Sequence, residues 1–127
     1  MAAYFQKWVV FVAFIVVGMS AARADDFRMD REIDYLLDSV VNSKCVFVRN
    51  GKKYKAIDAR EHLQMKRRRG KRYFDNTEEF IERLASKSSW SGKVYLIQCG
   101  NAPQQTTNSW FNALLVQYRS EPRNDII

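Results

Sequence analysis

Apolar residues recur at helical spacing in the first part of the chain. The positions i, i+3, i+4, i+7 and i+8 are occupied by Ile33, Leu36, Leu37, Val40 and Val41. This spacing places their side chains on one stripe, so we expect an amphipathic helix over residues 30–42. Aspartates occupy the opposite face and lie towards the N-terminal end, where the helix dipole favours acidic side chains.

A second helix is predicted from Ala56 to about Arg69. Ala59 and Leu63 continue its apolar face, and basic residues fill its last turn, where the dipole favours them. Gly70 follows directly and is placed to end the helix.

Two more helices are expected later in the chain. The third begins at a capping box, in which Asn76 and Glu79 are spaced to satisfy each other's backbone N–H groups, and it continues to about Ala85. The last helix covers residues 107–118. Its apolar stripe at i, i+4 and i+8 consists of Trp110, Leu114 and Tyr118.

Three short segments have the composition of β-strands. Residues 45–49 and 52–55 flank Asn50-Gly51, a pair that tolerates positive φ at both positions and therefore predicts a tight hairpin turn. Residues 93–99 are rich in β-branched and aromatic side chains. The following segment, 100–106, contains Gly and Pro and is interpreted as a break.

The predicted elements follow one another in the order α-β-β-α-α-β-α. This order is typical of an α+β fold, here a single small domain whose three-stranded antiparallel sheet is packed by helices. We place the domain at residues 25–121. The remaining residues, 122–127, are expected to form a frayed tail.

The first 24 residues have the pattern of a cleaved signal peptide. Lys7 precedes an apolar run from Trp8 to Val17, and Ala22-Arg23-Ala24 supplies the small residues of a cleavage site. The run is shorter than the roughly 20 residues that a membrane-spanning helix needs. We therefore expect export to the periplasm after cleavage near Ala24, with no transmembrane helix in the mature chain. An uncleaved membrane anchor is the alternative.

The two cysteines lie at the ends of predicted strands. Cys45 opens the first strand and Cys99 closes the third, and these two ends face each other if the strands are antiparallel neighbours. A disulfide is therefore expected in an exported chain. A closed zinc site needs four ligands, and the chain has one histidine, His62. We predict neither a metal site nor a cofactor.

Six of the seven residues in Lys66–Arg72 are basic, and the chain carries a formal net charge of +7. An exported protein meets little nucleic acid, so no nucleic-acid partner is expected. Two interpretations stay open: a solvated helix end that points outward, and an electrostatic patch that faces anionic envelope components. Acidic residues of the next helix, Glu78, Glu79 and Glu82, offer internal neutralisation.

Asp58, His62 and Lys66 share one helix stripe at i, i+4 and i+8. A carboxylate four residues before an imidazole can orient it for catalysis, and a nearby loop offers serine hydroxyls, Ser89 among them. A small hydrolase using His62 and a serine of residues 86–91 is therefore the enzymatic alternative. The competing interpretation is that His62 merely borders the core.

Several motifs follow one another along the chain: Phe47-x-Arg49-Asn50-Gly51, Asp58-x-x-x-His62-Leu63-x-x-Lys66, and Ala85-Ser86-Lys87-Ser88-Ser89-x-Ser91-Gly92-x-x-Tyr95. Together they resemble the YfeK-like family, small exported bacterial proteins with a domain of unknown function. The resemblance covers roughly residues 33–119 and implies export but no activity. The family does not always have the cysteine pair, and the basic run exceeds its pattern.

The polar residues of these motifs predict a shallow anion-accepting site. The hairpin turn, the helix stripe and the serine loop share side chains that a core does not need, and Lys66 or Lys87 would supply the charge. The residues concerned are Arg49, Asn50, His62, Lys66, Ser86, Lys87, Ser88, Ser89 and Ser91. In the alternative interpretation the serines are architectural and bond the neighbouring backbone.

These observations predict a non-enzymatic binding or cell-envelope-support module. Its partner would be an anionic envelope component or another periplasmic protein.

Overall fold

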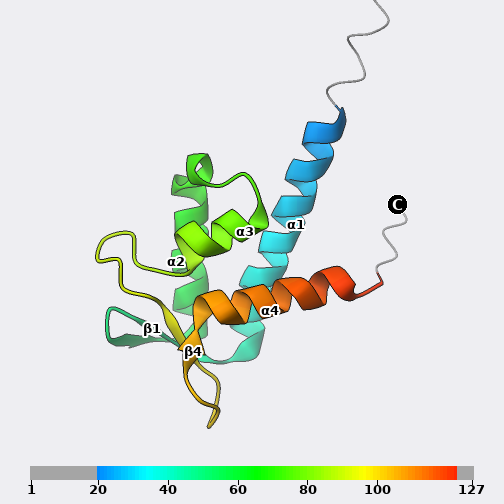
Figure 1. The fold of residues 1–127 in the computed structure, drawn as a ribbon. Helices are drawn as coiled ribbons and strands as arrows, with labels where there is room; N and C mark the ends of the chain where they lie inside the picture. Colours follow the sequence, from blue (N-terminus) through cyan, green and yellow to red (C-terminus); the bar gives the residue numbers. More distant parts are fainter. Residues whose placement is uncertain (1–19, 123–127) are drawn as a thin grey trace, which may run out of the picture.

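Four α-helices and a small antiparallel sheet form residues 20–122, the part of the chain that the computed structural model describes, and Figure 1 shows the sheet at one edge of the helices. The helices are α1 (Ser20–Ser43), α2 (Ala56–Arg69), α3 (Thr77–Phe80) and α4 (Thr107–Ser120). The strands are β1 (Val46–Arg49), β2 (Lys52–Tyr54), β3 (Leu96–Gln98) and β4 (Gln105–Thr106). A 3₁₀ turn, Lys71–Tyr73, follows α2, and a π-helical turn, Ile81–Ala85, extends α3. The predicted α+β class is confirmed.

The sheet has four strands in the order β2-β1-β3-β4, so the prediction of three strands was wrong by one. All three pairs are antiparallel. The additional strand, β4, has only two residues and pairs with Leu96 and Ile97. It lies in the segment that we interpreted as a break, because two polar residues carry no apolar alternation that would announce a strand.

The turn between β1 and β2 has the predicted conformation. Asn50 and Gly51 adopt φ values of 52° and 75°, as a primed two-residue turn requires. The predicted capping residue of α3 is also confirmed, because Oδ1 of Asn76 accepts a hydrogen bond of 2.8 Å from the backbone N–H of Glu79.

Helix α1 begins ten residues before the predicted start and runs across Ala24, the predicted cleavage position. Residues 23–28 are exposed, so this part of the helix has no apolar stripe by which the sequence would reveal it. The rest of the predicted signal peptide, residues 1–19, lies outside the described residues, as do residues 123–127 of the predicted tail.

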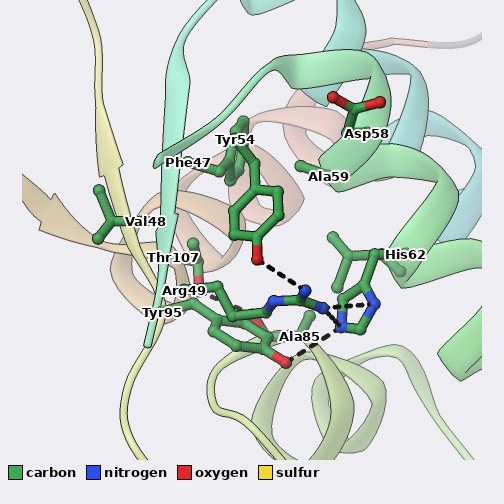
Figure 2. Close-up of a pocket in the computed structure, with 11 residues that line it drawn as sticks. Phe47, Val48, Arg49, Tyr54, Asp58, Ala59, His62, Ala85, Tyr95 and Thr107 are labelled. Atoms are coloured by element: carbon green, nitrogen blue, oxygen red, sulfur yellow. Dashed lines mark hydrogen bonds between the residues drawn. The ribbon is translucent and has the colours of Figure 1, made fainter. Parts of the chain in front are cut away.

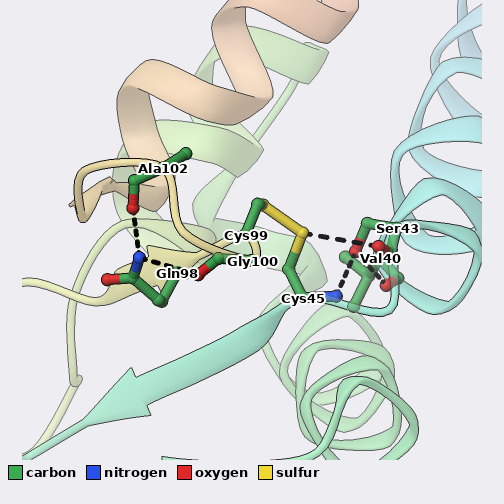
Figure 3. Close-up of a disulfide and its surroundings, with 7 residues drawn as sticks. All are labelled: Val40, Ser43, Cys45, Gln98, Cys99, Gly100 and Ala102. Carbon is green, nitrogen blue, oxygen red and sulfur yellow. Dashed lines mark hydrogen bonds between the residues drawn. A yellow bond between two sulfur atoms is a disulfide. The ribbon is translucent and has the colours of Figure 1, made fainter.

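The core lies between α1, the sheet and α4. The first four residues of the α1 stripe are buried as predicted, whereas Val41 is half-buried. The four share one core with Phe47 of β1, Ile97 of β3 and Phe111 of α4. The predicted disulfide between Cys45 and Cys99 is confirmed, with the two Cα atoms 4.4 Å apart. Figure 3 shows that it joins the start of β1 to the end of β3 beside the C-terminus of α1.

Helix α2 ends at Arg69, as predicted, and the backbone N–H of Gly70 donates to Lys66 O at 2.8 Å. A glycine is needed here for space, because an added Cβ would lie 2.8 Å from the backbone oxygen of Lys66. The interpretation that the whole basic cluster points outward was wrong for Lys66 and Arg67. Lys66 is buried, whereas Arg68 is exposed.

Arg67 is neutralised by α1 and not by the glutamates of the next helix. Its guanidinium lies 2.9 Å from Asp30 Oδ1 and 2.6 Å from Asp34 Oδ1. Because α1 starts at Ser20, these aspartates lie in the middle of the helix, where they face α2 and do not act on the helix dipole.

Replacing Arg67 with glutamine is expected to lower the free energy of unfolding by about 1–2 kcal/mol, since two charge-assisted bonds between α1 and α2 are lost. Arg68→Gln is the matched control, because Arg68 is exposed one residue further along the helix, and it should change stability by less than about 0.5 kcal/mol. Urea unfolding of both variants measures the difference. Equal values would mean that the Arg67 bonds contribute nothing.

Candidate functional site

Three polar side chains share the helix-covered face of the sheet with the core. Phe47 is paired with Tyr54 and with Ile97, and residues opposite each other in a ladder point to the same face. Arg49 lies two residues beyond Phe47, and Tyr95 lies two residues before Ile97. Because alternate residues of a strand share a face, the sheet presents Arg49, Tyr54 and Tyr95 together at the end where its apolar surface stops.

Helix α2 covers this end of the sheet and adds two basic side chains. Its buried residues Ala59 and Leu63 belong to the core. His62 and Lys66 lie beside them on the same helical stripe, spaced by one turn. The two side chains therefore meet the tyrosines and the arginine of the sheet.

Direct bonds link these residues into what we call the cation cluster: Arg49, His62 and Lys66 with the hydroxyls of Tyr54 and Tyr95. Figure 2 shows the cluster without Lys66. Nη1 of Arg49 donates to an imidazole nitrogen of His62 at 2.8 Å, and Nη2 donates to Tyr54 at 2.9 Å. The Tyr95 hydroxyl lies 3.3 Å from His62 Nε2 and accepts from Lys66 Nζ at 3.1 Å. Lys66 also donates to the carbonyl of Lys87 at 2.9 Å.

No carboxylate of residues 20–122 forms an ion pair with Arg49 or Lys66. Asp58 and His62 line one cavity, but Figure 2 shows the Asp58 carboxylate pointing away from His62. The positive charges of the cluster are therefore not neutralised within the described part of the chain.

The pKa values of the cluster reflect this arrangement. Burial, followed by the charges of Arg49 and Lys66, lowers the pKa of His62 from 6.5 to about 4. Burial, followed by the charge of Arg49, lowers the pKa of Lys66 from 10.5 to about 8. His62 is therefore neutral at pH 7, which agrees with its acceptance of a bond from Arg49, because a guanidinium can only donate.

The cation cluster separates two spaces. The inner one is a cavity of about 120 Å³ with an apolar wall that includes Phe47, Leu63 and Ala85. The outer one is an open hollow of about 480 Å³. Arg49, His62 and Tyr95 line both spaces. The outer hollow is also lined by two apolar residues, Met65 and Trp90, and by polar and basic ones: Asn50, Lys66, Arg69, Ser88 and Ser89.

The structure brings together the three predicted parts of the site. Ser91 Oγ donates to Asn50 Oδ1 at 2.5 Å, which ties the serine loop to the hairpin turn. Ser88 and Ser89 line the outer hollow beside His62. Lys87 contributes only its carbonyl to the cluster, and its side chain is exposed.

Two of the predicted serines have architectural contacts. Ser86 is buried, donates to the carbonyl of Ile81 at 2.5 Å and accepts from Asn108 at 2.8 Å, away from the cluster. Ser88 Oγ accepts from the backbone N–H groups of Trp90 and Ser91 at 3.3 and 3.2 Å, so it stabilises the loop.

The geometry gives the catalytic alternative no support. Asp58 does not orient His62, and the hydrogen-bond partners of His62 are Arg49 and Tyr95. An imidazole with a pKa of about 4 is a weak base at neutral pH. Within residues 20–122 no three His, Cys, Asp or Glu side chains are arranged to hold a metal ion.

Tyr54 and Tyr95 were missed as site residues. A signal was available, since both lie at positions that share the core face of the sheet with Phe47 and Ile97. Assigning the two tyrosines to this face requires the strand register. The hairpin turn gives the register for Tyr54, but only the β1–β3 pairing gives it for Tyr95.

Comparison with known proteins finds a matching family and a similar protein, both of unknown function. The profile of a family of unknown function, DUF5329, matches residues 27–119. The uncharacterized protein YfeK of Salmonella typhimurium (strain LT2) is 30% identical over 91 residues, which are 71% of this chain and 76% of that protein. No solved structure matches the chain. In residues 20–122 no helix combines the length and the apolar character of a membrane span.

Proposed function

We propose that this chain, which belongs to the DUF5329 family of unknown function, is a non-enzymatic binding protein. It accepts a small anion, or the anionic group of a larger ligand, at the cation cluster. One observation carries this proposal: Arg49, His62 and Lys66 converge on an open hollow, and no carboxylate of residues 20–122 pairs with the two cations.

Holding the positive charges of Arg49 and Lys66 close together costs electrostatic free energy, which a bound anion would offset. The lowered pKa of Lys66 means that the folded protein disfavours its charged form. A negative charge within a few ångströms favours that form again, and in a partly enclosed hollow the attraction is stronger than in water. Arg49 suits the task, because a guanidinium binds carboxylate, sulfate or phosphate through two parallel bonds.

We place this binding protein outside the cytoplasm. Disulfides such as Cys45–Cys99 persist in oxidising compartments, and the N-terminal sequence has the pattern of an export signal. Anionic envelope components are then the ligands that such a site would meet.

Sulfate is the probe for this site, because it keeps two negative charges between pH 6 and 9. We expect wild-type protein to bind sulfate more tightly as the pH falls from 9 to 7, with proton uptake. The sign follows from Lys66: its pKa of about 8 leaves the free amine partly neutral in this range, and the bound anion favours the protonated form. Isothermal titration calorimetry in two buffers of different ionisation enthalpy measures both quantities.

Lys66→Gln is the matched variant for this experiment, since the amide keeps one hydrogen-bond donor and removes the titrating charge. Its sulfate affinity should be lower and nearly constant from pH 9 to 7. Absence of sulfate binding by the wild type, or an identical pH dependence in the variant, would refute the proposed site.

A further inference from the structure

The side chain of Trp90 is 97% exposed at the tip of a loop between α3 and β3. The loop is held by its own backbone: Ser88 N donates to Lys93 O and Gly92 N donates to Ser88 O, both at 2.9 Å. Lys87 and Val94 pair across its base. Hydrogen bonds of Ser88 Oγ fix the backbone of Trp90 itself. The loop is therefore an ordered support that presents a bare indole outward.

A second exposed aromatic ring lies on the other side of the same surface. Tyr73 is 49% exposed and lines a hollow of about 550 Å³ that shares Met65, Lys66, Arg69 and Ser89 with the outer hollow beside Trp90. The two hollows thus adjoin, with Trp90 and Tyr73 at their margins and the basic end of α2 between them.

Positive charge dominates between the two rings. Arg69 is exposed and pairs with no carboxylate of the described residues, and Arg72 donates to the Tyr73 hydroxyl at 3.0 Å. Arg83 forms an ion pair with Glu79, in which Nη2 lies 3.4 Å from Oε1. We call the surface formed by Arg69, Arg72, Tyr73 and Trp90 the aromatic–basic face.

We propose that the aromatic–basic face docks on the surface of an anionic phospholipid bilayer, with the Trp90 indole at the level of the headgroups. Tryptophan and tyrosine favour the interface between water and hydrocarbon. Basic side chains close to the bilayer are attracted to anionic lipids. The indole of Trp90, which no other part of the described chain covers, suits the interface between water and hydrocarbon. Arg69 and Arg72, which have no acidic partners in the described chain, suit the anionic headgroups.

This inference goes beyond anion binding at the cation cluster and does not depend on it. The two are compatible in space, because the outer hollow is lined by both Trp90 and Lys66. A docked protein would therefore hold the opening of the cation cluster next to the lipid headgroups.

Co-sedimentation of the exported, oxidised protein with vesicles tests the proposal. Wild-type protein should bind vesicles of phosphatidylglycerol and phosphatidylcholine mixed one to one, and not vesicles of phosphatidylcholine alone. Trp90→Ala should weaken binding about tenfold, and Arg69→Gln with Arg72→Gln about 25-fold, at about fivefold per charge. Rising salt should weaken binding of the wild type.

Val116→Ala is the control for Trp90→Ala, because Val116 is 70% exposed on α4, and it should bind vesicles like the wild type. Arg72 lies outside the outer hollow, so Arg72→Gln should weaken vesicle binding about fivefold while its sulfate affinity stays that of the wild type, which separates this proposal from the cation cluster. No binding to the anionic vesicles, equal binding of the Trp90→Ala and Val116→Ala variants, or equal binding to both lipid compositions would overturn the proposal.

Discussion

Replacing both Cys45 and Cys99 with serine is expected to lower the free energy of unfolding by about 4 kcal/mol. The bridge closes a loop with a sequence separation of 54, which encloses β1, β2, α2, α3 and β3. Opening it restores the conformational entropy of that loop to the unfolded chain. Because the total free energy of unfolding of a small domain is only about 5–15 kcal/mol, the variant should unfold at a far lower urea concentration or fail to fold at 37 °C.

Reduction of the wild type with dithiothreitol provides the matched control, since it opens the same loop without changing the sequence. The reduced protein and the Cys45→Ser/Cys99→Ser variant should have the same unfolding free energy within about 1 kcal/mol. A change below about 1 kcal/mol for both would contradict the expected effect and mean that the β1–β3 pairing and the core hold the sheet without the bridge.

Substituting Arg49 with glutamine is expected to weaken sulfate binding at least tenfold, because charge-assisted hydrogen bonds contribute about 1.5–3 kcal/mol each. The same change removes a positive charge from the surroundings of two basic groups. The pKa of His62 should rise above its value of about 4, and that of Lys66 above about 8, without reaching 6.5 and 10.5, since burial remains the larger cause of both shifts.

His62 is the only histidine of the chain, so its imidazole signals can be followed by NMR in untagged protein. The pKa of His62 is lower in the folded protein than its ordinary value of 6.5. Its contribution to stability is therefore complete above pH 6.5 and is lost as the pH falls towards 4. Arg49→Gln should reduce this loss. Lys53→Gln, an exposed change on β2, is the control, and an identical His62 pKa in both variants would exclude Arg49 as a cause.

Local patterns with a direct physical reason predicted their elements correctly. The α1 stripe, the Asn50-Gly51 turn and the Asn76 cap each depend on residues that are close in sequence. The two-residue strand β4 was not predicted, because its two polar residues carry no apolar alternation. The π-helical turn at Ile81–Ala85 was not predicted either, and it is bonded to a distant residue, since Thr107 Oγ1 donates to the carbonyl of Ala85 at 2.7 Å.

Most of the polar residues that line the outer hollow were named from the sequence, whereas their electrostatics were not predicted. Nothing in the basic run distinguishes Lys66, which is buried beside Tyr95, from Arg67, which bonds aspartates of α1. The difference arises from how α1 and the sheet pack against α2. Packing also decides which serines have structural contacts and which line the hollow. Ser86 donates to the backbone carbonyl of Ile81, whereas Ser89 lines the outer hollow.

The most direct test of the central claim, that the cation cluster takes an anion, is the dependence of the unfolding free energy on sulfate at constant ionic strength, pH 7. Sulfate stabilises proteins generally through exclusion from their surface. The test therefore compares the sulfate-induced increase in unfolding free energy of the wild type with that of Arg49→Gln. A specific site adds a saturable increase of RT ln(1 + [L]/Kd) to the wild type alone. We expect this additional, saturable stabilisation in the wild type and its absence in Arg49→Gln. Equal, non-saturating increases in both proteins would contradict the claim.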